Sequence, residues 1–340
     1  MKNFRENKIN KNLNFDEILN KINTVKSRIL IVLDRKKILG TITDSDIRKH
    51  MLDINYKLTA ENVMNSKPRI LKVRNQQKFE TKRLPKNIRY FPVVDDRKNF
   101  KFVYENKSIN KNFFKNIIIM AGGKGLRLRP LTKKIPKPMI RIKGKPLLDL
   151  QLKILSEYDT DNIFISVNYL KEKIINYFKK KKYNLKYIIE NKPLGTAGSL
   201  SRIKLTKENF PLLIMNGDIL TNFNFNEFYN FHCKFNNDIT IGSSRYNTIV
   251  PFGVMNYDKN YNLKKIDEKP TFQYLCSAGI YAISNKVFRL IPKNKKFDFN
   301  ELINISIKKK LKIKIFPIYE TWNDIGDKEI LNQIRKVKSN

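Results

Sequence analysis

The segment Asn116-Ile-Ile-Ile-Met-Ala-Gly-Gly-Lys-Gly-Leu-Arg-Leu-Arg-Pro-Leu-Thr132 decides the fold of the larger part of this chain. It begins with an apolar run typical of a buried strand, and three glycines within four positions follow directly. Successive backbone N–H groups in such a loop can form a cradle for an anion. The segment is not a Walker loop, because no Gly-Lys-Ser/Thr follows. It also misses the dinucleotide fingerprint, because Gly123-x-Gly125 is followed by Leu128.

Beyond this segment, short apolar runs alternate with stretches of helical periodicity, which predicts an α/β domain built from βαβ units. We expect strands at 116–120, 162–167, 185–189, 210–215 and 312–316 and near Thr240, Val254 and Ile280, and helices at 146–158, 170–178, 196–203 and 300–309 and from Asp327. The polar, Asn- and Lys-rich stretch before the first strand predicts a linker. The predicted organisation is a small domain at 1–108, a linker at 109–115 and the larger domain at 116–340.

The composition is strongly basic, with 69 Lys and Arg against 31 Asp and Glu and a net charge of +38 over 340 residues. Such an excess is the electrostatic footprint of a nucleic-acid binder. However, lysines recur throughout the chain, and no zinc-finger, RNP or basic-zipper pattern occurs. We therefore expect compositional bias rather than a nucleic-acid partner, with attraction to anionic small molecules or lipid surfaces as the alternative.

Other classes are also excluded by composition. Two cysteines and two histidines cannot form a disulfide framework or a Cys/His zinc cluster. The apolar runs are too short for a membrane span, and no secretory signal begins the sequence, so we expect a cytoplasmic location. We also expect the chain to form a homo-oligomer.

Taken whole, residues 122–138 closely resemble the signature of sugar-1-phosphate nucleotidyltransferases, G-G-x-G-T-R-L-x-P-L-T-x-x-x-P-K-P, with one departure at Leu126, where the family has Thr. Further motifs resemble those of the family in the same order: Ile189–Gly198, Met215–Asp218, Val250–Val254, Asp267–Pro270, Ser277–Tyr281 and Trp322–Gly326. The resemblance covers nearly all of residues 116–330 and implies a Rossmann-like domain with a mixed sheet.

What the resemblance implies chemically is the transfer of a nucleoside monophosphate from an NTP to a sugar-1-phosphate, with pyrophosphate released. It implies catalytic roles for Arg127, Lys137 and Lys269, and Mg²⁺ bound by Asp218 and Asp324. It implies nucleotide contacts at Ala121, Gly122, Gly123, Gly125, Glu190, Pro193, Gly195 and Thr196, and sugar contacts at Gly253, Glu268 and Gly279. The simpler alternatives are turn or cap roles for the two aspartates and solvated surface positions or ion pairs for the other charged residues.

Glu190 bears on the choice of nucleotide. In the resembled family, the residue at this place contacts the edge of the base. Guanine presents two adjacent donors, which one ionised carboxylate can accept, whereas uracil and thymine present a single donor. We therefore expect GTP, and a GDP-sugar for surface glycan or polysaccharide synthesis. The alternatives are a uridylyl- or thymidylyltransferase, a protein that only senses nucleotides, and an exposed Glu190 without a ligand role.

The first hundred residues carry a second resemblance. Arg28–Arg48 predicts two strands and a helix start and resembles a CBS motif, a small unit that usually occurs as a tandem pair. Gly40-x-x-Thr43-x-x-Asp46 matches that family's contacts to adenosine ribose and phosphate, so Thr43 and Asp46 are candidate ligands of an adenine nucleotide. The second unit departs from the pattern, since Asn99–Tyr104 lacks the Gly and the Thr-x-x-Asp. The alternative is a CBS pair that serves only as a packing or dimer surface.

Overall fold

The computed structural model describes residues 5–25, 27–51, 58–79, 84–85, 88–106, 113–326 and 328–336. The chain divides into two units, Met1–Asn112 and Phe113–Asn340. Of the predicted linker, residues 109–112 lie outside the described residues, whereas Phe113 and Phe114 are buried in the core of the second unit. Among the described residues, no helix is long and apolar enough to cross a membrane.

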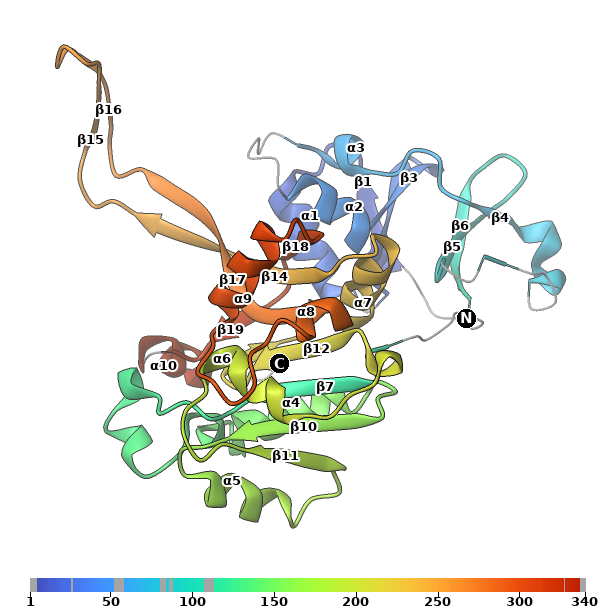
Figure 1. Ribbon diagram of the computed structural model, residues 1–340. Helices are drawn as coiled ribbons and strands as arrows, with labels where there is room; N and C mark the ends of the chain where they lie inside the picture. The colour runs from blue at the N-terminus through green and yellow to red at the C-terminus, as the bar shows by residue number, and fades with distance from the viewer. Residues whose placement is uncertain are drawn as a thin grey trace. The chain divides into compact units, whose positions relative to one another are not determined.

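The second unit is built on a seven-stranded sheet (Figure 1). In spatial order its strands are β11 (Leu185–Ile189), β10 (Asn162–Val167), β7 (Asn116–Met120), β12 (Leu212–Asn216), β17 (Thr271–Ile283), β14 (Ile239–Ile249) and β18 (Ile313–Ile318). Strands β11, β10, β7 and β12 are mutually parallel, while β17 runs antiparallel to β12 and β14. Ile117, Ile118 and Ile119 are fully buried because β7 lies mid-sheet with both faces covered.

Helices cover both faces of this sheet. Helices α4 (Leu147–Leu155), α5 (Lys171–Phe178) and α7 (Phe225–Lys234) contribute to the core on one face. Helices α6 (Gly195–Gly198), α8 (Asn285–Phe288) and α9 (Phe299–Lys308) contribute to the core on the other. The three layers confirm the predicted α/β class with a mixed sheet.

Two predicted details differ from the structure. The helix expected at 196–203 is the single turn α6 followed by a 3-10 turn, η6 (Ser199–Arg202). Helix α7 was not predicted, because its Phe- and Tyr-rich sequence favours strands. Asn224 starts α7 by accepting a hydrogen bond from the Glu227 N–H at 3.3 Å.

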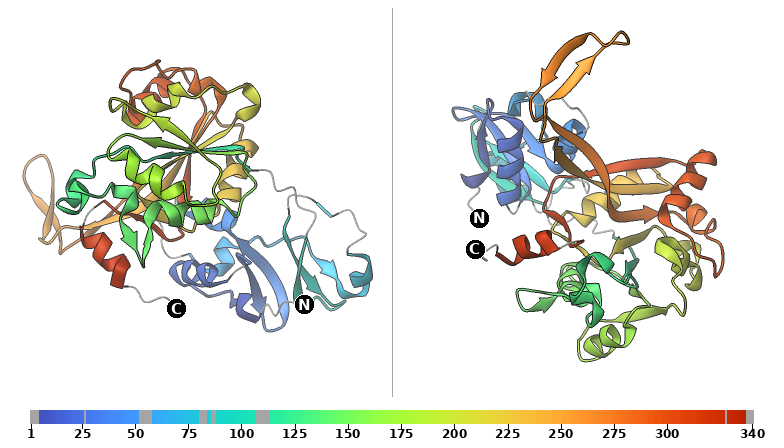
Figure 2. Two further views of the ribbon diagram at one scale, coloured as in Figure 1. Left: turned by 90° about the horizontal axis from the view of Figure 1, so that it is seen from below. Right: turned by 90° about the vertical axis from the view of Figure 1, so that its left-hand side faces the viewer.

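Short elements complete the second unit. Strand β13 (Ile219–Thr221) pairs with β19 (Trp322–Asp324), and β8 (Arg141–Ile142) pairs with β9 (Lys145–Pro146). The hairpin of β15 (Val254–Tyr257) and β16 (Leu263–Asp267) stands at the far end of the long β14–β17 ribbon (Figure 2). The remaining elements are the 3-10 turns η3 (Leu126–Leu128), η4 (Leu131–Lys133), η5 (Lys137–Met139) and η7 (Lys207–Asn209) and the helix α10 (Lys328–Lys336).

The first unit contains the same strand arrangement twice. One sheet has the order β1 (Lys8–Asn10), β2 (Ile29–Asp34), β3 (Lys37–Thr43), and the other β4 (Leu71–Lys72), β5 (Tyr90–Val94), β6 (Phe100–Glu105). In each sheet the first pair is parallel and the second antiparallel. Its helices are α1 (Phe15–Thr24), α2 (Asp44–His50) and α3 (Ala60–Val63), with 3-10 turns η1 (Arg5–Asn7) and η2 (Val73–Lys78).

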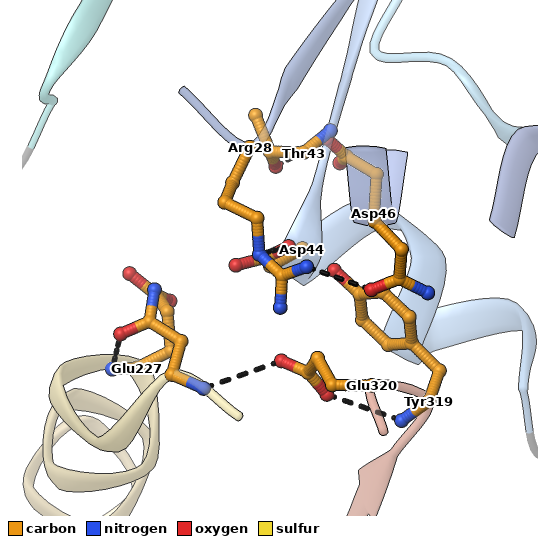
Figure 3. A network of polar contacts seen from close by, with 9 residues as sticks. Arg28, Thr43, Asp44, Asp46, Glu227, Tyr319 and Glu320 are labelled. Atoms are coloured by element: carbon orange, nitrogen blue, oxygen red, sulfur yellow. Dashed lines mark hydrogen bonds and ion pairs between the residues drawn. The ribbon is translucent and has the colours of Figure 1, made fainter. Parts of the chain in front are cut away.

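Thr43 and Asp46 form the N-terminal cap of α2 (Figure 3). The backbone N–H and the hydroxyl of Thr43 donate to Asp46 Oδ2 at 3.0 and 2.7 Å. Arg28 Nε lies 3.5 Å from Asp44 Oδ1 in the first turn of the same helix. An equivalent capping box, Thr59 with Asn62, begins α3. The two candidate adenine-nucleotide ligands therefore also have a local structural role.

Candidate active site

Three neighbouring strands of the sheet end at one edge, where the loops that follow them meet. Met120 pairs with Ser166 of β10 on one side and with Asn216 of β12 on the other. The Ala121 N–H donates to the Ser166 carbonyl at 2.9 Å, and the Gly217 N–H donates to the Met120 carbonyl at 2.8 Å. Open α/β sheets bind ligands outside the carboxyl ends of their parallel strands. This edge is therefore the expected place for a site.

The glycine loop after β7 is tight at one point and open at another. Gly125 has a φ of +60°, which side chains of L-residues rarely adopt, and a Cβ there would lie 3.0 Å from Thr132 Cγ2. The Thr132 hydroxyl donates to the Gly125 carbonyl at 2.8 Å and fixes this turn. At Gly123, by contrast, no atom of the described chain lies within 4 Å of a Cβ position. A ligand can thus approach the backbone at Gly123.

Arg127 follows the glycine loop in the turn η3 and is exposed. A Cβ on Gly326 would lie 3.2 Å from Arg127 Nη2 and 3.4 Å from its Cζ, so the guanidinium rests against the Gly326 backbone. Gly326 stands two residues after Asp324, and the glycine leaves room for the cation there. The structure thus brings Arg127 to the loop that carries Asp324.

Lys137 joins the two predicted metal ligands. Its ammonium group contacts Asp218 Oδ2 and lies 3.6 Å from Asp324 Oδ1. Lys137 is only 9% exposed, so water screens its ammonium group poorly, whereas the side chain of Asp324 is 40% exposed. Three residues from separate motifs of the sequence therefore meet in one cluster.

Backbone pairing fixes the two carboxylates next to each other. Ile219 of β13 pairs with Asp324 of β19, and the Ile325 N–H donates to the Asp218 carbonyl at 3.0 Å. From α4, the Gln151 amide donates to the Ile219 carbonyl at 2.6 Å. The spacing of Asp218 and Asp324 is thus set by a short ladder and not by their side chains alone.

The environment of Asp324 opposes its ionised form. Burial and, next, the negative charge of Asp218 raise the pKa of Asp324, while Lys137 and Arg127 act to lower it. The net direction is upward, so burial and the charge of Asp218 together outweigh the opposing effect of Lys137 and Arg127.

The carboxylates also suit a divalent cation. Asp218 Oδ1 and Asp324 Oδ1 are buried and accept no hydrogen bond within the described chain. Mg²⁺ is commonly held by one or two carboxylates, with waters and substrate phosphates completing its shell. The described residues contain no group of three or more His, Cys, Asp or Glu that could hold a metal. The donor set therefore fits Mg²⁺ shared with a phosphate better than a closed protein site.

Glu190 connects the glycine loop to the loop that follows β11. Its carboxylate, in a side chain 5% exposed, accepts from the Ser166 hydroxyl at 2.5 Å and from the Leu194 N–H at 2.9 Å. A Cβ on Gly122 would lie 3.2 Å from Glu190 Oε1, so a glycine is needed beside this carboxylate. Both oxygens already accept one hydrogen bond, and each retains capacity for another.

The loop after β11 is tied to the start of α9. The Thr196 N–H donates to Asp298 Oδ1 at 2.8 Å, and the Phe299 N–H donates to the Thr196 hydroxyl at 2.9 Å. Gly195 has a φ of +79°, and a Cβ there would lie 2.6 Å from Asp298 Oδ1. Pro193 lies exposed at the tip of this loop.

The predicted sugar ligands lie in two places. A Cβ on Gly279 would lie 2.5 Å from Asn216 Nδ2, so this glycine borders the carboxyl end of β12. Gly253, Glu268 and Lys269 lie at the base of the β15–β16 hairpin, where a Cβ on Gly253 would lie 3.2 Å from Glu268 Oε2. Within the described chain, no hydrogen bond or ion pair joins Lys269 to the Lys137 cluster.

Three residues of the site were not found from the sequence. Ser166 holds Glu190, Gln151 holds β13, and Asp298 holds the loop at Thr196. Ser166 and Gln151 lie inside a strand and a helix, where no local signal distinguishes them. Asp298 did have a signal, since Asp298-x-x-Glu301 is a capping-box pattern.

Comparisons with known proteins find similar proteins for the second unit. Residues 116–338 match the protein family described as nucleotidyl transferase. The bifunctional protein GlmU of Methanocaldococcus jannaschii is 33% identical over 216 residues, which are 62% of this chain and 50% of that protein. The mannose-1-phosphate guanyltransferase of Saccharomyces cerevisiae is 30% identical over 220 residues, covering 62% of this chain and 60% of that protein. The chain thus spans about half the length of the curated relatives it matches.

A solved structure is similar as well. HddC from Yersinia pseudotuberculosis, crystallised with GMP-PN, is 26% identical, with a TM-score of 0.51. The match covers 65% of this chain and 98% of HddC. The second unit therefore has the fold of this group of proteins.

Replacing Asp324 with Asn should raise the melting temperature at neutral pH in metal-free buffer. Because the pKa of Asp324 is raised in the folded state, the stability that its protonated form contributes is present below the unfolded pKa and is lost as the pH rises through the folded pKa. Thermal melts across pH should therefore show that the variant melts at a higher temperature than the wild type at neutral pH, and that this difference shrinks toward about pH 4. As a control, Asp267→Asn should give no gain, since chiefly its hydrogen bond from Lys265 lowers the pKa of Asp267. A lower melting temperature for Asp324→Asn at neutral pH would contradict the expectation.

Proposed function

Because this chain belongs to the nucleotidyl transferase family over residues 116–338, we propose that it transfers a nucleoside monophosphate from an NTP to a sugar-1-phosphate. The observation that carries the proposal is the cluster of Lys137, Asp218 and Asp324 beside a glycine loop. A protein that only binds nucleotides has no need for two half-buried carboxylates, each with a buried oxygen that accepts no hydrogen bond within the described chain. Enzymes are named among the relatives, and one name, mannose-1-phosphate guanyltransferase, states a sugar-1-phosphate as substrate.

In the proposed reaction, an oxygen of the sugar phosphate attacks the α-phosphorus of the NTP. The new P–O bond forms as the bond to the β-phosphate oxygen breaks, and pyrophosphate leaves with the electron pair. The nucleophile is already ionised, so the site needs positive charge and alignment more than a general base. Arg127 is exposed beside the glycine loop and binds the NTP phosphates, and Lys137 neutralises charge that develops around the α-phosphorus.

Asp218 and Asp324 would hold Mg²⁺, which supplies Lewis-acid charge to the phosphates when it is bound. Their unfilled oxygens support this role, and a bound cation would favour the ionised form of Asp324, which burial and the charge of Asp218 oppose. The backbone ladder of β13 and β19 keeps the carboxylates together before any ligand arrives.

The sugar phosphate is proposed to bind toward the β15–β16 hairpin. Lys269 pairs with its phosphate, Glu268 accepts from sugar hydroxyls, and Gly253 and Gly279 let the sugar approach the backbone. Gly279 supports this placement because it borders the end of β12, and Gly253 because it lies against Glu268. The NDP-sugar formed would serve surface glycan or polysaccharide synthesis in the cytoplasm.

GTP is the proposed donor. Guanyltransferases occur repeatedly among the similar proteins, and HddC was crystallised with GMP-PN. The Glu190 carboxylate faces Gly122 at the edge where the two nucleotide loops meet, and its remaining acceptor capacity suits the two donors of guanine. UTP or dTTP transfer to a hexose-1-phosphate is the alternative within the same chemistry.

The first unit is proposed to be a CBS pair with one adenine-nucleotide site. Support comes from the strand arrangement, which occurs twice in the same order. Only the first copy carries the Thr43–Asp46 pattern, so only one site is proposed.

Replacing Asp218 with Asn should lower kcat/KM for pyrophosphate release by at least about 100-fold, the usual effect of losing one group that stabilises transition-state charge. The assay combines four NTPs with a panel of sugar-1-phosphates, with Mg²⁺ or with EDTA. The control Asp161→Asn changes an exposed aspartate at the opposite end of β10 and should leave the rate unchanged. Nucleotide binding without any pyrophosphate release from the wild-type chain would favour a sensing protein instead.

Glu190→Gln should lower kcat/KM for GTP by at least about tenfold more than for UTP, because an amide offers only one acceptor to the two donors of guanine. The ratio of the two values separates base recognition from the structural role, since loss of the Ser166 and Leu194 hydrogen bonds affects every nucleotide equally. An unchanged ratio, or equal turnover of GTP, UTP and dTTP by the wild type, contradicts the GTP assignment.

An adenine nucleotide should raise the melting temperature of the wild-type chain, and Thr43→Ala should abolish that shift. Removing a cap residue costs about 1 kcal/mol by itself, so the ligand-induced shift is measured and not the absolute melting temperature. Thr59→Ala is the matched control, because Thr59 caps α3 in the same way and has no proposed ligand. If millimolar AMP, ADP and ATP leave the wild type unchanged, the regulatory site is excluded and the pair serves for packing.

A further inference from the structure

The β15–β16 hairpin has one apolar and one polar face. Met255 pairs with Ile266 and Tyr257 with Leu263, and opposite residues of an antiparallel pair lie on the same face. These four side chains, the apolar face, are all more than half exposed. Tyr261, 86% exposed, stacks on Tyr257 with ring centroids 6.4 Å apart.

The opposite face of the same hairpin is polar, and its polar side chains pair with one another. The Asn256 amide donates to Asp267 Oδ2 at 2.8 Å, and Lys265 Nζ lies 2.5 Å from Asp267 Oδ1. Alternate residues of a strand point to opposite faces, and the sequence separates apolar from polar side chains here except at Val254, which pairs with Asp267, and at the register shift beside Tyr257. Such a pattern is typical of a strand pair with one face buried.

The second unit itself does not bury this face. Strands β15 and β16 form a sheet of only two strands, and the views show the hairpin extending beyond the seven-stranded sheet (Figures 1 and 2). A two-stranded hairpin alone is marginally stable in water, and an exposed apolar patch on a protein commonly marks an interaction site. Further along the β14–β17 ribbon, Tyr246 pairs with Tyr274 and both are more than half exposed.

Charge distinguishes among the partners that could cover the apolar face. Residues 246–275, the arm, contain four lysines against three acidic residues, a net charge of +1, in a chain of +38. A nucleic acid or an anionic membrane would be drawn to the strongly basic remainder rather than to the arm, where three acidic residues nearly cancel four lysines. Two copies of the chain, which repel each other elsewhere, meet at the arm with little electrostatic cost.

We propose that the apolar face of the arm is a dimer interface that docks on the same face of a second copy of this chain. A twofold interface needs a surface that complements itself, and an apolar patch on a nearly neutral arm meets that requirement. The inference does not depend on the transferase activity. It gives the expected homo-oligomer a specific surface.

The test is the molar mass of the 340-residue chain by sedimentation equilibrium across a range of concentrations. The wild type should approach twice the 40.3 kDa of one chain. Met255→Lys should raise the dimer dissociation constant at least about tenfold, because each copy then buries an unpaired charge. Asn256→Lys is the matched control: it adds the same charge at the next residue on the opposite face, and it should leave the constant nearly unchanged.

Three results would overturn the proposal. The first is a wild-type chain that stays monomeric up to high micromolar concentration. The second is an equal effect of the two substitutions, or no effect of either, which would move the dimer interface elsewhere. The third is a monomer that binds phosphatidylserine vesicles through Met255, measured by co-sedimentation, which would make a membrane the occupant. Melting temperatures of both variants establish that the fold is intact.

Discussion

The ammonium group of Lys137 between the carboxylates of Asp218 and Asp324 is the interaction on which the site depends. Two carboxylates held close together in a half-buried place repel each other, and burial together with this repulsion raises the pKa of Asp324. The pairing of β13 with β19 holds the two carboxylates close together, and the positive charge of Lys137 offsets part of their repulsion. Holding two carboxylates together in this way lowers the stability of the folded chain, and a further bound cation would offset that loss. Such an arrangement is characteristic of sites that bind metal-bound phosphates.

The nucleotide loops are organised by carboxylates as well. Glu190 is fixed by Ser166 and faces Gly122, while Asp298 holds Gly195 and Thr196 at the start of α9. Each carboxylate orders backbone N–H groups of a loop, and neighbouring glycines provide the space it needs. The loops are therefore rigid at their bases, and their open positions, such as Gly123, are left for a ligand. Preorganisation of this kind lowers the cost of ordering the site during binding.

The net charge of +38 has a limited part in this picture. A site for two phosphate-bearing substrates uses only a few cations, of which Lys137 lies in the cluster and Arg127 lies against Gly326 nearby. The excess has a second consequence, because it makes self-association unfavourable over most of the surface. Repulsion between two copies is weakest at the arm, which has a net charge of +1 and an uncovered apolar face.

The sequence by itself determined the α/β class, most strand and helix positions of the second unit and the motif residues Lys137, Asp218 and Asp324, because strand periodicity and contiguous motifs are local. It did not identify α7, whose aromatic residues favour strands in isolation and form a helix only when packed on the sheet. It also could not show that Lys137 bridges two aspartates, that Ser166 holds Glu190, or that the hairpin has an uncovered face. Only the tertiary structure decided these, because each depends on strand register and on contacts between segments far apart in the chain, which no local pattern encodes.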